Sequence, residues 1–224
     1  MRILVGCEES QIVTEAFIAM GHDAMSCDLE HPGAKGLPYY RGSVLDLFGE
    51  QFDLFIAHPP CTRLTNSGNQ WLARRGLWHE LEDAAEFFLQ CLNAPFPRIA
   101  VENPIMHKYA RALIGVKYSQ IIQPWQFGHG EQKSTCLWLK GLPKLKPTNI
   151  VEGREQRLYK LPPGDDRSML RSRTYEGIAR AMAEQWGAPN TACSGLLGFA
   201  RQNYLIHPSE HTVSWEASKR ANSR

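Results

Sequence analysis

A cysteine stands directly after a double proline at the end of a short apolar run. Leu54 to Ala57 is typical of a buried strand, and His58, Pro59, Pro60 and Cys61 follow it. Proline fixes φ and forces the preceding residue into an extended conformation, so this turn is stiff and presents the thiol in one direction. Ligands of open α/β sheets bind at the carboxyl ends of strands. The position therefore favours a nucleophile, although an isolated Pro-Pro-Cys is more often a buried structural cysteine.

A second apolar strand ends in a carboxylate and an amide. Arg98 to Val101 leads into Glu102, Asn103 and Pro104. If this strand is the parallel neighbour of the first, Glu102 lies on the same rim as the Cys61 thiol. Glu102 alone is more often a structural acid that caps the next helix. Two reactive strand ends on one rim outweigh both structural alternatives and predict an active site.

The first 28 residues have the order strand, glycine turn, helix, strand, acid. This is the order of a nucleotide-binding βαβ unit, with Gly6 in the turn and Asp28 after the second strand. Gly6 stands alone, and the carboxylates of Glu8 and Glu9 would repel a pyrophosphate. A cationic ligand without phosphates, such as S-adenosylmethionine, fits better. A generic α/β turn with solvated acids is an equally good interpretation of this segment alone.

The rest of the chain completes an α/β core and a basic loop. We expect a loop over 29–42, a polar loop over 62–70, a helix from Trp71 to Leu92, and two antiparallel strands over 119–125 and 134–139. The predicted organisation is a catalytic core over 1–139, a basic Pro- and Gly-rich loop over 140–173, a closing helix over 174–187 and a polar tail over 188–224. Basic residues of the loop either contact phosphates or are simply solvated.

Composition narrows the class of protein. The 224 residues are 43% hydrophobic and 21% charged with a net charge of +2, as in a water-soluble globular protein, so nucleic-acid affinity requires a local basic patch. The six cysteines are scattered and form no CxxC pair, so we expect neither a disulfide framework nor a metal site. No apolar stretch has transmembrane length, and Met1 leads straight into a strand, so we expect a cytoplasmic protein without a signal peptide.

The ordered motifs resemble those of the DNA cytosine-5 methyltransferases. They are Pro59-Pro60-Cys61, Val101-Glu102-Asn103-Pro104, Glu131-Gln132-Lys133 before a strand, and a closing helix at 175–180. The resemblance implies a class I S-adenosylmethionine-dependent fold, Rossmann-like and mostly parallel with one antiparallel strand. It also implies S-adenosyl-L-methionine as cofactor and DNA as partner, with the target base flipped out of the stack.

The resemblance also assigns catalytic roles. Cys61 would add to C6 of cytosine, which makes C5 nucleophilic enough to take a methyl group. Glu102 would protonate or hydrogen-bond N3, for which we expect a raised pKa. Asn103 would help to hold that acid, and Pro60 would shape the pocket.

By position, the resemblance places the cofactor and the substrate on separate residues. Gly6, Cys7, Glu8, Asp28 and Pro59 match the cofactor site. Ser43 stands where the family has an adenine-reading aspartate, and Asp46 is the candidate substitute. Gln132 and Lys133 match a substrate motif whose following arginines are absent here, so Arg171 or Arg173 is expected to take over their contact with the base.

The loop over 140–173 is too short for a separate target-recognition domain. In this compactness the chain resembles the enzymes that bacteriophages carry. The resemblance implies modification of phage or prophage DNA in a bacterial cytoplasm. We expect a monomer. Two other classes stay open: a methyltransferase acting on another nucleic acid or a nucleotide, and a silent relative that binds DNA or S-adenosylmethionine. Amino-methyltransferases are weaker candidates because they need an aromatic residue at the position of Cys61.

Overall fold

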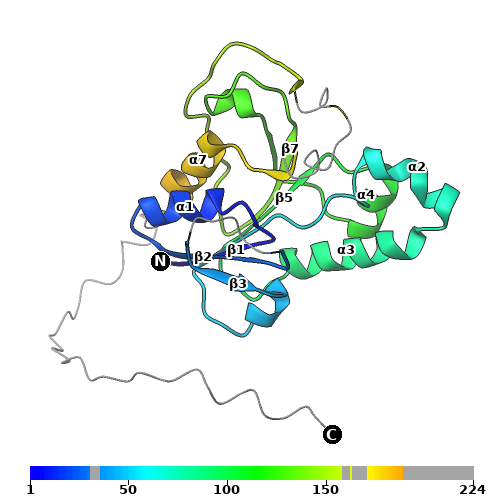
Figure 1. Cartoon of the computed structure of the whole chain (residues 1–224), viewed down its shortest axis with the longest axis horizontal. Helices are drawn as coiled ribbons and strands as arrows, with labels where there is room; N and C mark the ends of the chain where they lie inside the picture. The colour runs from blue at the N-terminus through cyan, green and yellow to red at the C-terminus, as the bar shows by residue number, and fades with distance from the viewer. Residues whose placement is uncertain (31–35, 158–161, 163–170, 189–224) are drawn as a thin grey trace, which may run out of the picture. The chain divides into compact units, whose positions relative to one another are not determined.

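A central seven-stranded sheet organises the part of the chain that the computed structural model describes, residues 1–30, 36–157, 162 and 171–188 (Figure 1). Its strands are β1 (Arg2–Gly6), β2 (Asp23–Asp28), β3 (Tyr39–Arg41), β4 (Leu54–Ala57), β5 (Ile99–Pro104), β6 (Gln120–Ile122) and β7 (Thr135–Lys140). Their order is β3-β2-β1-β4-β5-β7-β6, and β7 runs antiparallel to both of its neighbours. The prediction of a mostly parallel, Rossmann-like class I fold with one reversed strand is confirmed.

The register brings the strand ends to one rim. Gly6 pairs with Cys27 and with Ala57, and Ala57 pairs in turn with Val101. The carboxyl ends of β1, β2, β4 and β5 therefore meet at the same edge of the sheet. In a doubly wound sheet this edge, next to the strand where the chain order reverses, is where ligands bind.

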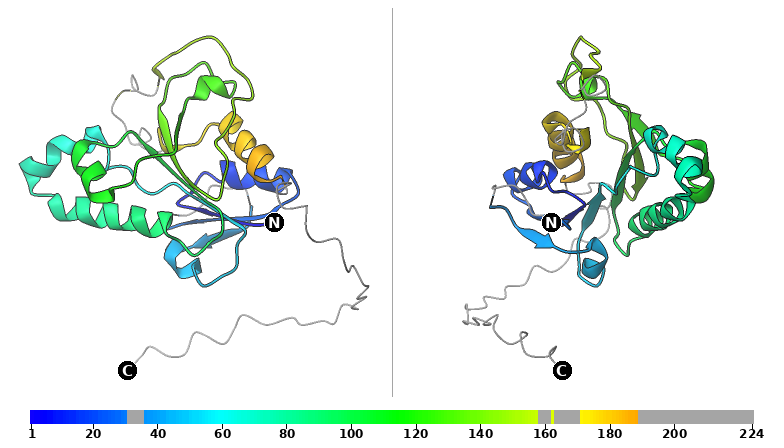
Figure 2. Two further views of the ribbon diagram at one scale, coloured as in Figure 1. Left: turned by 180° about the vertical axis from the view of Figure 1, so that it is seen from behind. Right: turned by 45° about the vertical axis from the view of Figure 1, so that its right-hand side comes forward.

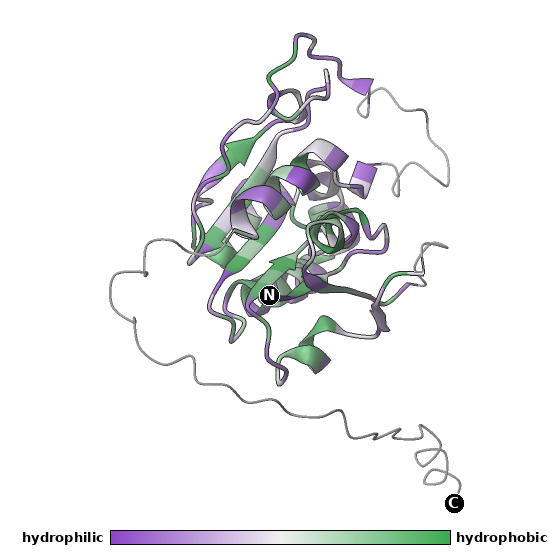
Figure 3. Ribbon diagram, turned by 90° about the vertical axis from the view of Figure 1, so that its left-hand side faces the viewer, coloured by the Kyte–Doolittle hydropathy of each residue, from purple (hydrophilic) through white to green (hydrophobic). Residues whose placement is uncertain are grey.

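Helices cover both faces of the sheet (Figure 2). α1 (Ile12–Ala19) and α7 (Glu176–Trp186) pack together on one face, and α3 (Trp78–Leu92) and α4 (Lys108–Ile114) on the other. Side chains alternate along the strands, so Ile3 and Val5 of β1 join one apolar cluster and Leu4 joins the other. Figure 3 shows the resulting apolar strands between the helices. α2 (Asn66–Arg75) and the short 3₁₀ helices η1 (Val44–Leu47) and η2 (Pro124–Gln126) complete the elements described.

The strands and helices differ from the sequence-based predictions in several places, and α4 lies in a segment for which no element was predicted. The loop predicted over 29–42 contains the short strand β3, and the loop predicted over 62–70 becomes helix α2 from Asn66 onward. The single helix predicted from Trp71 is two helices, since Gly76 lies between them at φ 64°. Fully buried Leu64 and Leu72 anchor α2 to the core, which overrides its polar composition. The tail beyond Ala188 and most of 158–170 lie outside the described residues.

Candidate active site at the carboxyl rim of the sheet

A cleft of about 380 Å³ lies at the carboxyl rim. It collects eleven of the residues predicted from sequence: Cys7, Glu8, Asp28, Pro59, Pro60, Cys61, Glu102, Asn103, Lys133, Arg171 and Arg173. They come from the ends of β1, β2, β4 and β5 and from the segments that precede β7 and α7. His58, Glu9, Glu30 and Thr174 also line the cleft. The topology thus brings together residues that are up to 166 positions apart, from Cys7 to Arg173.

Four predicted residues do not line this cleft. Gly6 lies beneath it, where a methyl group would come within 2.7 Å of Val44 Cγ2. Ser43 accepts a hydrogen bond from the Leu45 amide and caps η1, and Asp46 accepts one from the Tyr40 hydroxyl at 3.1 Å. The Gln132 side chain accepts a hydrogen bond from Gln156. The ligand-binding roles of these four residues stay predictions.

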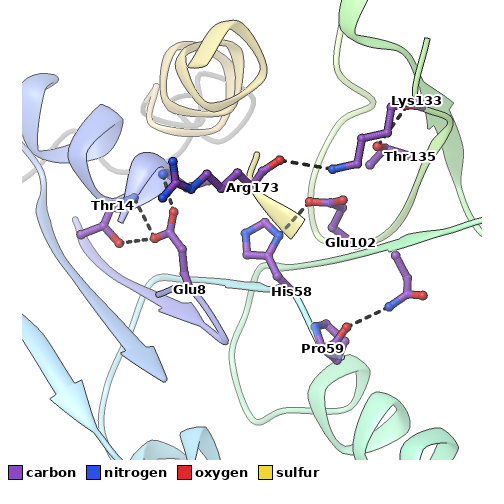
Figure 4. A network of polar contacts seen from close by, with 10 residues as sticks. Glu8, Thr14, His58, Pro59, Glu102, Lys133, Thr135 and Arg173 are labelled. Atoms are coloured by element: carbon purple, nitrogen blue, oxygen red, sulfur yellow. Dashed lines mark hydrogen bonds and ion pairs between the residues drawn. The ribbon is translucent and has the colours of Figure 1, made fainter. Parts of the chain in front are cut away.

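His58 is the cleft residue whose role sequence reasoning missed. Its Nδ1 lies 2.8 Å from Oε2 of Glu102, and their side chains are only 12% and 11% exposed (Figure 4). His58 directly precedes the Pro-Pro turn, and Glu102 ends the neighbouring parallel strand. That adjacency was the available signal, but no pattern in the sequence indicates which residue pairs with the histidine.

The pair corrects the expectation of a raised pKa for Glu102. Burial alone raises the pKa of this carboxyl, but the hydrogen bond and charge of His58, together with Lys133 and Thr174, outweigh burial and lower it. For His58, burial acts in the opposite direction and lowers the pKa, because it again disfavours the charged form. The hydrogen bond and charge of Glu102, together with the charge of Glu8, outweigh burial and raise the pKa of His58 overall. Both shifts favour the ion pair, in which the imidazole carries the proton and Glu102 is a carboxylate.

The Cys61 thiol is protonated in the resting protein. Burial and then the charge of Glu102 raise its pKa, while Lys133 and Arg171 act in the opposite direction. The carbonyl of Cys61 accepts hydrogen bonds from the amides of Leu64 and Thr65, which fixes the turn after the prolines. The thiol is thus held in place but needs a change in its surroundings to ionise.

Asn103 holds the proline turn. Its Nδ2 donates to the carbonyl of Pro59 at 2.9 Å, its side chain is buried, and its Oδ1 has no hydrogen-bond partner among the described residues. The predicted role of holding Glu102 stays a prediction. Because the bond joins the end of β5 to the end of β4, it fixes the position of Cys61 relative to Glu102.

Glu8 closes the N-terminus of α1. Its carboxylate accepts hydrogen bonds from the amides of Val13 and Thr14 and from the Thr14 hydroxyl, and the residue is only 4% exposed. Cys7 and Gln11, on either side of it, have φ of 58° and 55°, an uncommon conformation outside glycine. The alternative of a solvated acid is wrong for Glu8. Since a carboxylate already occupies this helix terminus, a phosphate is disfavoured there.

Comparisons with known proteins add little to this geometry. No family model matches the chain, and no curated protein matches it. Among solved structures, it is similar to a protein named as a DNA modification methyltransferase encoded within an E. coli prophage, with 14% identity and a TM-score of 0.45. It is also similar to the Entamoeba histolytica methyltransferase EhMeth, with 12% identity and a TM-score of 0.43.

The two matches cover 72% and 73% of this chain but only 55% and 60% of those proteins. Likeness at this level carries no argument about activity. The functional argument therefore depends on the site itself.

The cleft contains an acidic and a basic set of side chains. Glu8, Glu9, Asp28 and Glu30 come from the ends of β1 and β2 and form the acidic half. The basic half consists of Lys133, which precedes β7, and of Arg171 and Arg173, which precede α7, and the Arg173 side chain points toward Glu8 (Figure 4). The Lys133 ammonium donates to the carbonyl of Arg173 at 3.2 Å and joins these two segments. Cys61 and the His58–Glu102 pair also line this cleft, which suits a cationic ligand on one side and an anionic one on the other.

The described residues offer no group of three His, Cys, Asp or Glu side chains placed to hold a metal ion. None of the helices among them combines the length and hydropathy required to cross a membrane.

Proposed function

We propose that this chain is an S-adenosylmethionine-dependent DNA cytosine-5 methyltransferase that acts through a covalent Cys61 adduct. The observation that carries the proposal is one cleft in which a rigidly held thiol accompanies a buried, proton-holding His58–Glu102 pair. Adding a thiolate to a cytosine ring requires a nucleophile and a proton source at the same time. This cleft contains both.

The acidic half of the cleft fits the cofactor. S-adenosylmethionine carries a sulfonium and an ammonium group and no phosphate, which matches the carboxylates there and the occupied terminus of α1. Asp28, at the end of β2, is placed to accept hydrogen bonds from ribose hydroxyls. When bound, the cofactor supplies the methyl group that C5 accepts.

The chain's own residues prepare the ring. The Cys61 thiol gives up its proton to solvent water, and its sulfur forms a bond to C6 while the His58–Glu102 pair delivers a proton to N3. The electrons displaced from the C5–C6 double bond then make C5 nucleophilic. After C5 is methylated, its hydrogen leaves as a proton, the bond from sulfur to C6 breaks, and N3 returns its proton to the pair.

The basic half of the cleft fits the nucleotide that carries the ring. Lys133, Arg171 and Arg173 offer positive charge to a phosphate close to the flipped base. In a duplex, flipping costs a few kcal/mol, which such contacts help to offset. We further propose that the substrate is phage or prophage DNA in a bacterial cytoplasm. Bisulfite sequencing of DNA from expressing cells would identify the methylated sites.

Trapping with DNA that contains 5-fluorocytosine tests the mechanism. The hydrogen at C5 normally leaves as a proton, but fluorine cannot leave as a cation. The sulfur–C6 bond therefore persists after methylation and should appear as a protein–DNA adduct on a denaturing gel. We expect the adduct only with S-adenosylmethionine present, and none from Cys61→Ser. Cys7→Ser removes the other thiol lining the cleft and serves as the matched control, which should still be trapped.

An adduct formed by Cys61→Ser would refute the covalent role of Cys61. If calorimetry shows cofactor binding but wild-type protein gives no adduct, the chain is a silent binder or acts on another substrate.

A further inference from the structure

Two segments that leave the cleft carry positive charge and no acid. Residues 62–79, after Cys61, contain Arg63, Arg74 and Arg75 without an Asp or Glu, but Arg63 forms an ion pair with Glu80 at 2.7 Å, so Arg74 and Arg75 carry the argument. Residues 103–130, after Glu102, contain Lys108, Arg111 and Lys117, again without an acid. In a chain with a net charge of +2, this is a local concentration of positive charge.

The fold brings the two segments side by side next to the cleft. Thr65 and Met106 form an isolated β-bridge, and the His107 amide donates to the carbonyl of Leu64 at 3.0 Å. From this junction α2 and α4 lead away from the ends of β4 and β5, and they lie close together in Figures 1 and 2. Trp78, at the start of α3, packs edge-on against Tyr109 of α4, with ring centroids 5.1 Å apart.

Exposed aromatic rings and cations alternate on this surface. The Arg75 guanidinium lies 4.4 Å from the ring centroid of Trp71, and the Lys108 ammonium lies 4.8 Å from that of Tyr109. Trp78 is 41% exposed and Tyr109 is 38% exposed, so both rings are accessible to a ligand. We name the residues Trp71, Arg74, Arg75, Trp78, Lys108 and Tyr109 the α2–α4 face. Cations beside aromatic planes are the arrangement that holds unpaired nucleic-acid strands.

We propose that the α2–α4 face binds the DNA strand that flanks the flipped cytosine, with its cations on phosphates and Tyr109 against a base. This inference rests on the proposed function, because it needs a nucleic-acid substrate in the cleft. The occupant follows from charge complementarity and from continuity with the Cys61 and Glu102 strand ends. A second copy of this chain would bring the same positive charge to the face and is disfavoured.

The basic loop over 140–173 is a weaker candidate for the same task. In its described part, the Arg154 guanidinium stacks 3.8 Å from the ring centroid of Trp125 and also donates to the carbonyl of Val151. Arg157 forms an ion pair with Glu131 at 2.6 Å. Arg157 is thus neutralised by a carboxylate, and Arg154 donates to the backbone of its own loop.

The salt dependence of DNA binding tests the cations of the face. Each phosphate contact contributes about 0.9 to the slope of log affinity against log salt on duplex DNA. The triple variant Arg74→Ala, Arg75→Ala, Lys108→Ala should therefore lower the slope by about 2.7, equally for unrelated sequences. The matched control Lys144→Ala, Lys146→Ala, Arg154→Ala removes the same charge from the basic loop and should leave the slope near that of wild type. The proposal would be overturned if the slope is unchanged in the variant of the α2–α4 face, or if the slope falls only in the variant of the basic loop.

Tyr109 tests the aromatic contribution. Stacking of one base contributes about 1–3 kcal/mol, so Tyr109→Ala should weaken binding to a single strand about 5- to 140-fold. Tyr109→Phe keeps the ring and should bind like wild type, whereas equal binding by the Ala variant would exclude stacking. Cofactor affinity by calorimetry should be normal in all variants and reports on folding.

Other outcomes separate this inference from the proposed function. Suppose that wild-type protein is trapped on 5-fluorocytosine DNA but the face variants keep the wild-type salt slope. The proposal that the α2–α4 face binds DNA would then be wrong, and the proposed function would stand. Absence of both DNA binding and trapping would reject both proposals. If sedimentation shows a wild-type dimer that the face variants disrupt without a change in slope, the face is an interface between copies of this chain.

Discussion

In the proposed mechanism His58 holds the proton that the cytosine ring receives, so its replacement gives a sharp test. His58→Asn retains a side-chain amide near the position of Nδ1, which can still donate to Glu102, but it cannot carry a proton in the physiological range. In the variant the proton must be carried by Glu102 itself. The change therefore alters the proton supply while it preserves the shape of the cleft.

The size of the effect follows from the two groups. The ordinary pKa values of histidine and glutamate, 6.5 and 4.5, differ by about two pH units, and the pKa of His58 is raised further. At neutral pH, a lone carboxyl is therefore protonated about 100-fold less often than the imidazole. Burial raises the pKa of Glu102 once the His58 charge is gone, which recovers part of this loss. We expect adduct formation to slow by about 10- to 100-fold.

The assay is the single-turnover rate of adduct formation on 5-fluorocytosine DNA across a range of pH. Below the pKa of His58 the rate should rise with pH, because the Cys61 thiolate becomes more abundant while the imidazole stays protonated. Above it, loss of the imidazolium cancels that gain and the rate levels off, so the wild-type break lies above pH 6.5. In His58→Asn the break should move toward the range of a carboxyl group.

The exposed His79 on α3 provides the matched control, since His79→Asn should leave both the rate and the break unchanged. If His58→Asn has the wild-type rate and the wild-type break in its pH–rate profile, the proposal that His58 and Glu102 share the delivered proton is wrong.

Two further predictions test the other groups of the cleft. Glu102→Gln should slow methylation of DNA by about 10²- to 10⁴-fold, as is typical when a general acid is lost, with little change in cofactor affinity. Wild-type turnover would mean that Glu102 is structural. Asp28→Ala should weaken S-adenosylmethionine binding in calorimetry without loss of thermal stability, because the carboxylate lies on the rim and not in the core. Lower stability with unchanged binding would mean that the βαβ unit does not bind the cofactor.

Strand ends could be located from the sequence because parallel strands have a simple geometry. Each buried run that stops at Gly6, Asp28, Cys61 or Glu102 contributes its last residues to one rim, whatever the details of side-chain packing. This is why eight of the eleven predicted residues line one cleft, whereas Lys133, Arg171 and Arg173 come from the segments that precede β7 and α7. Ser43 and Asp46 follow β3, a strand of three residues that the sequence pattern did not reveal.

Contacts between strand ends could not be predicted in the same way. The bond from His58 to Glu102 depends on side-chain orientation across 44 positions in sequence, and it reverses the direction of the expected pKa shift of Glu102. The polar segment that begins α2 has the composition of a loop, and only the burial of Leu64 and Leu72 makes it part of the core. Likewise, charge counts in the basic loop could not show that Arg157 is paired with Glu131.

The electrostatics of the cleft link its two halves. In the resting protein, burial and the Glu102 carboxylate keep the Cys61 thiol protonated and therefore poorly reactive. A cation bound in the cleft would favour the thiolate through its charge. Lys133 and Arg171 act in the same direction as that cation from the basic half. In this arrangement Cys61 ionises readily only when the cofactor and the nucleotide are both bound. It therefore does not add to a bound ring before the methyl donor is in place.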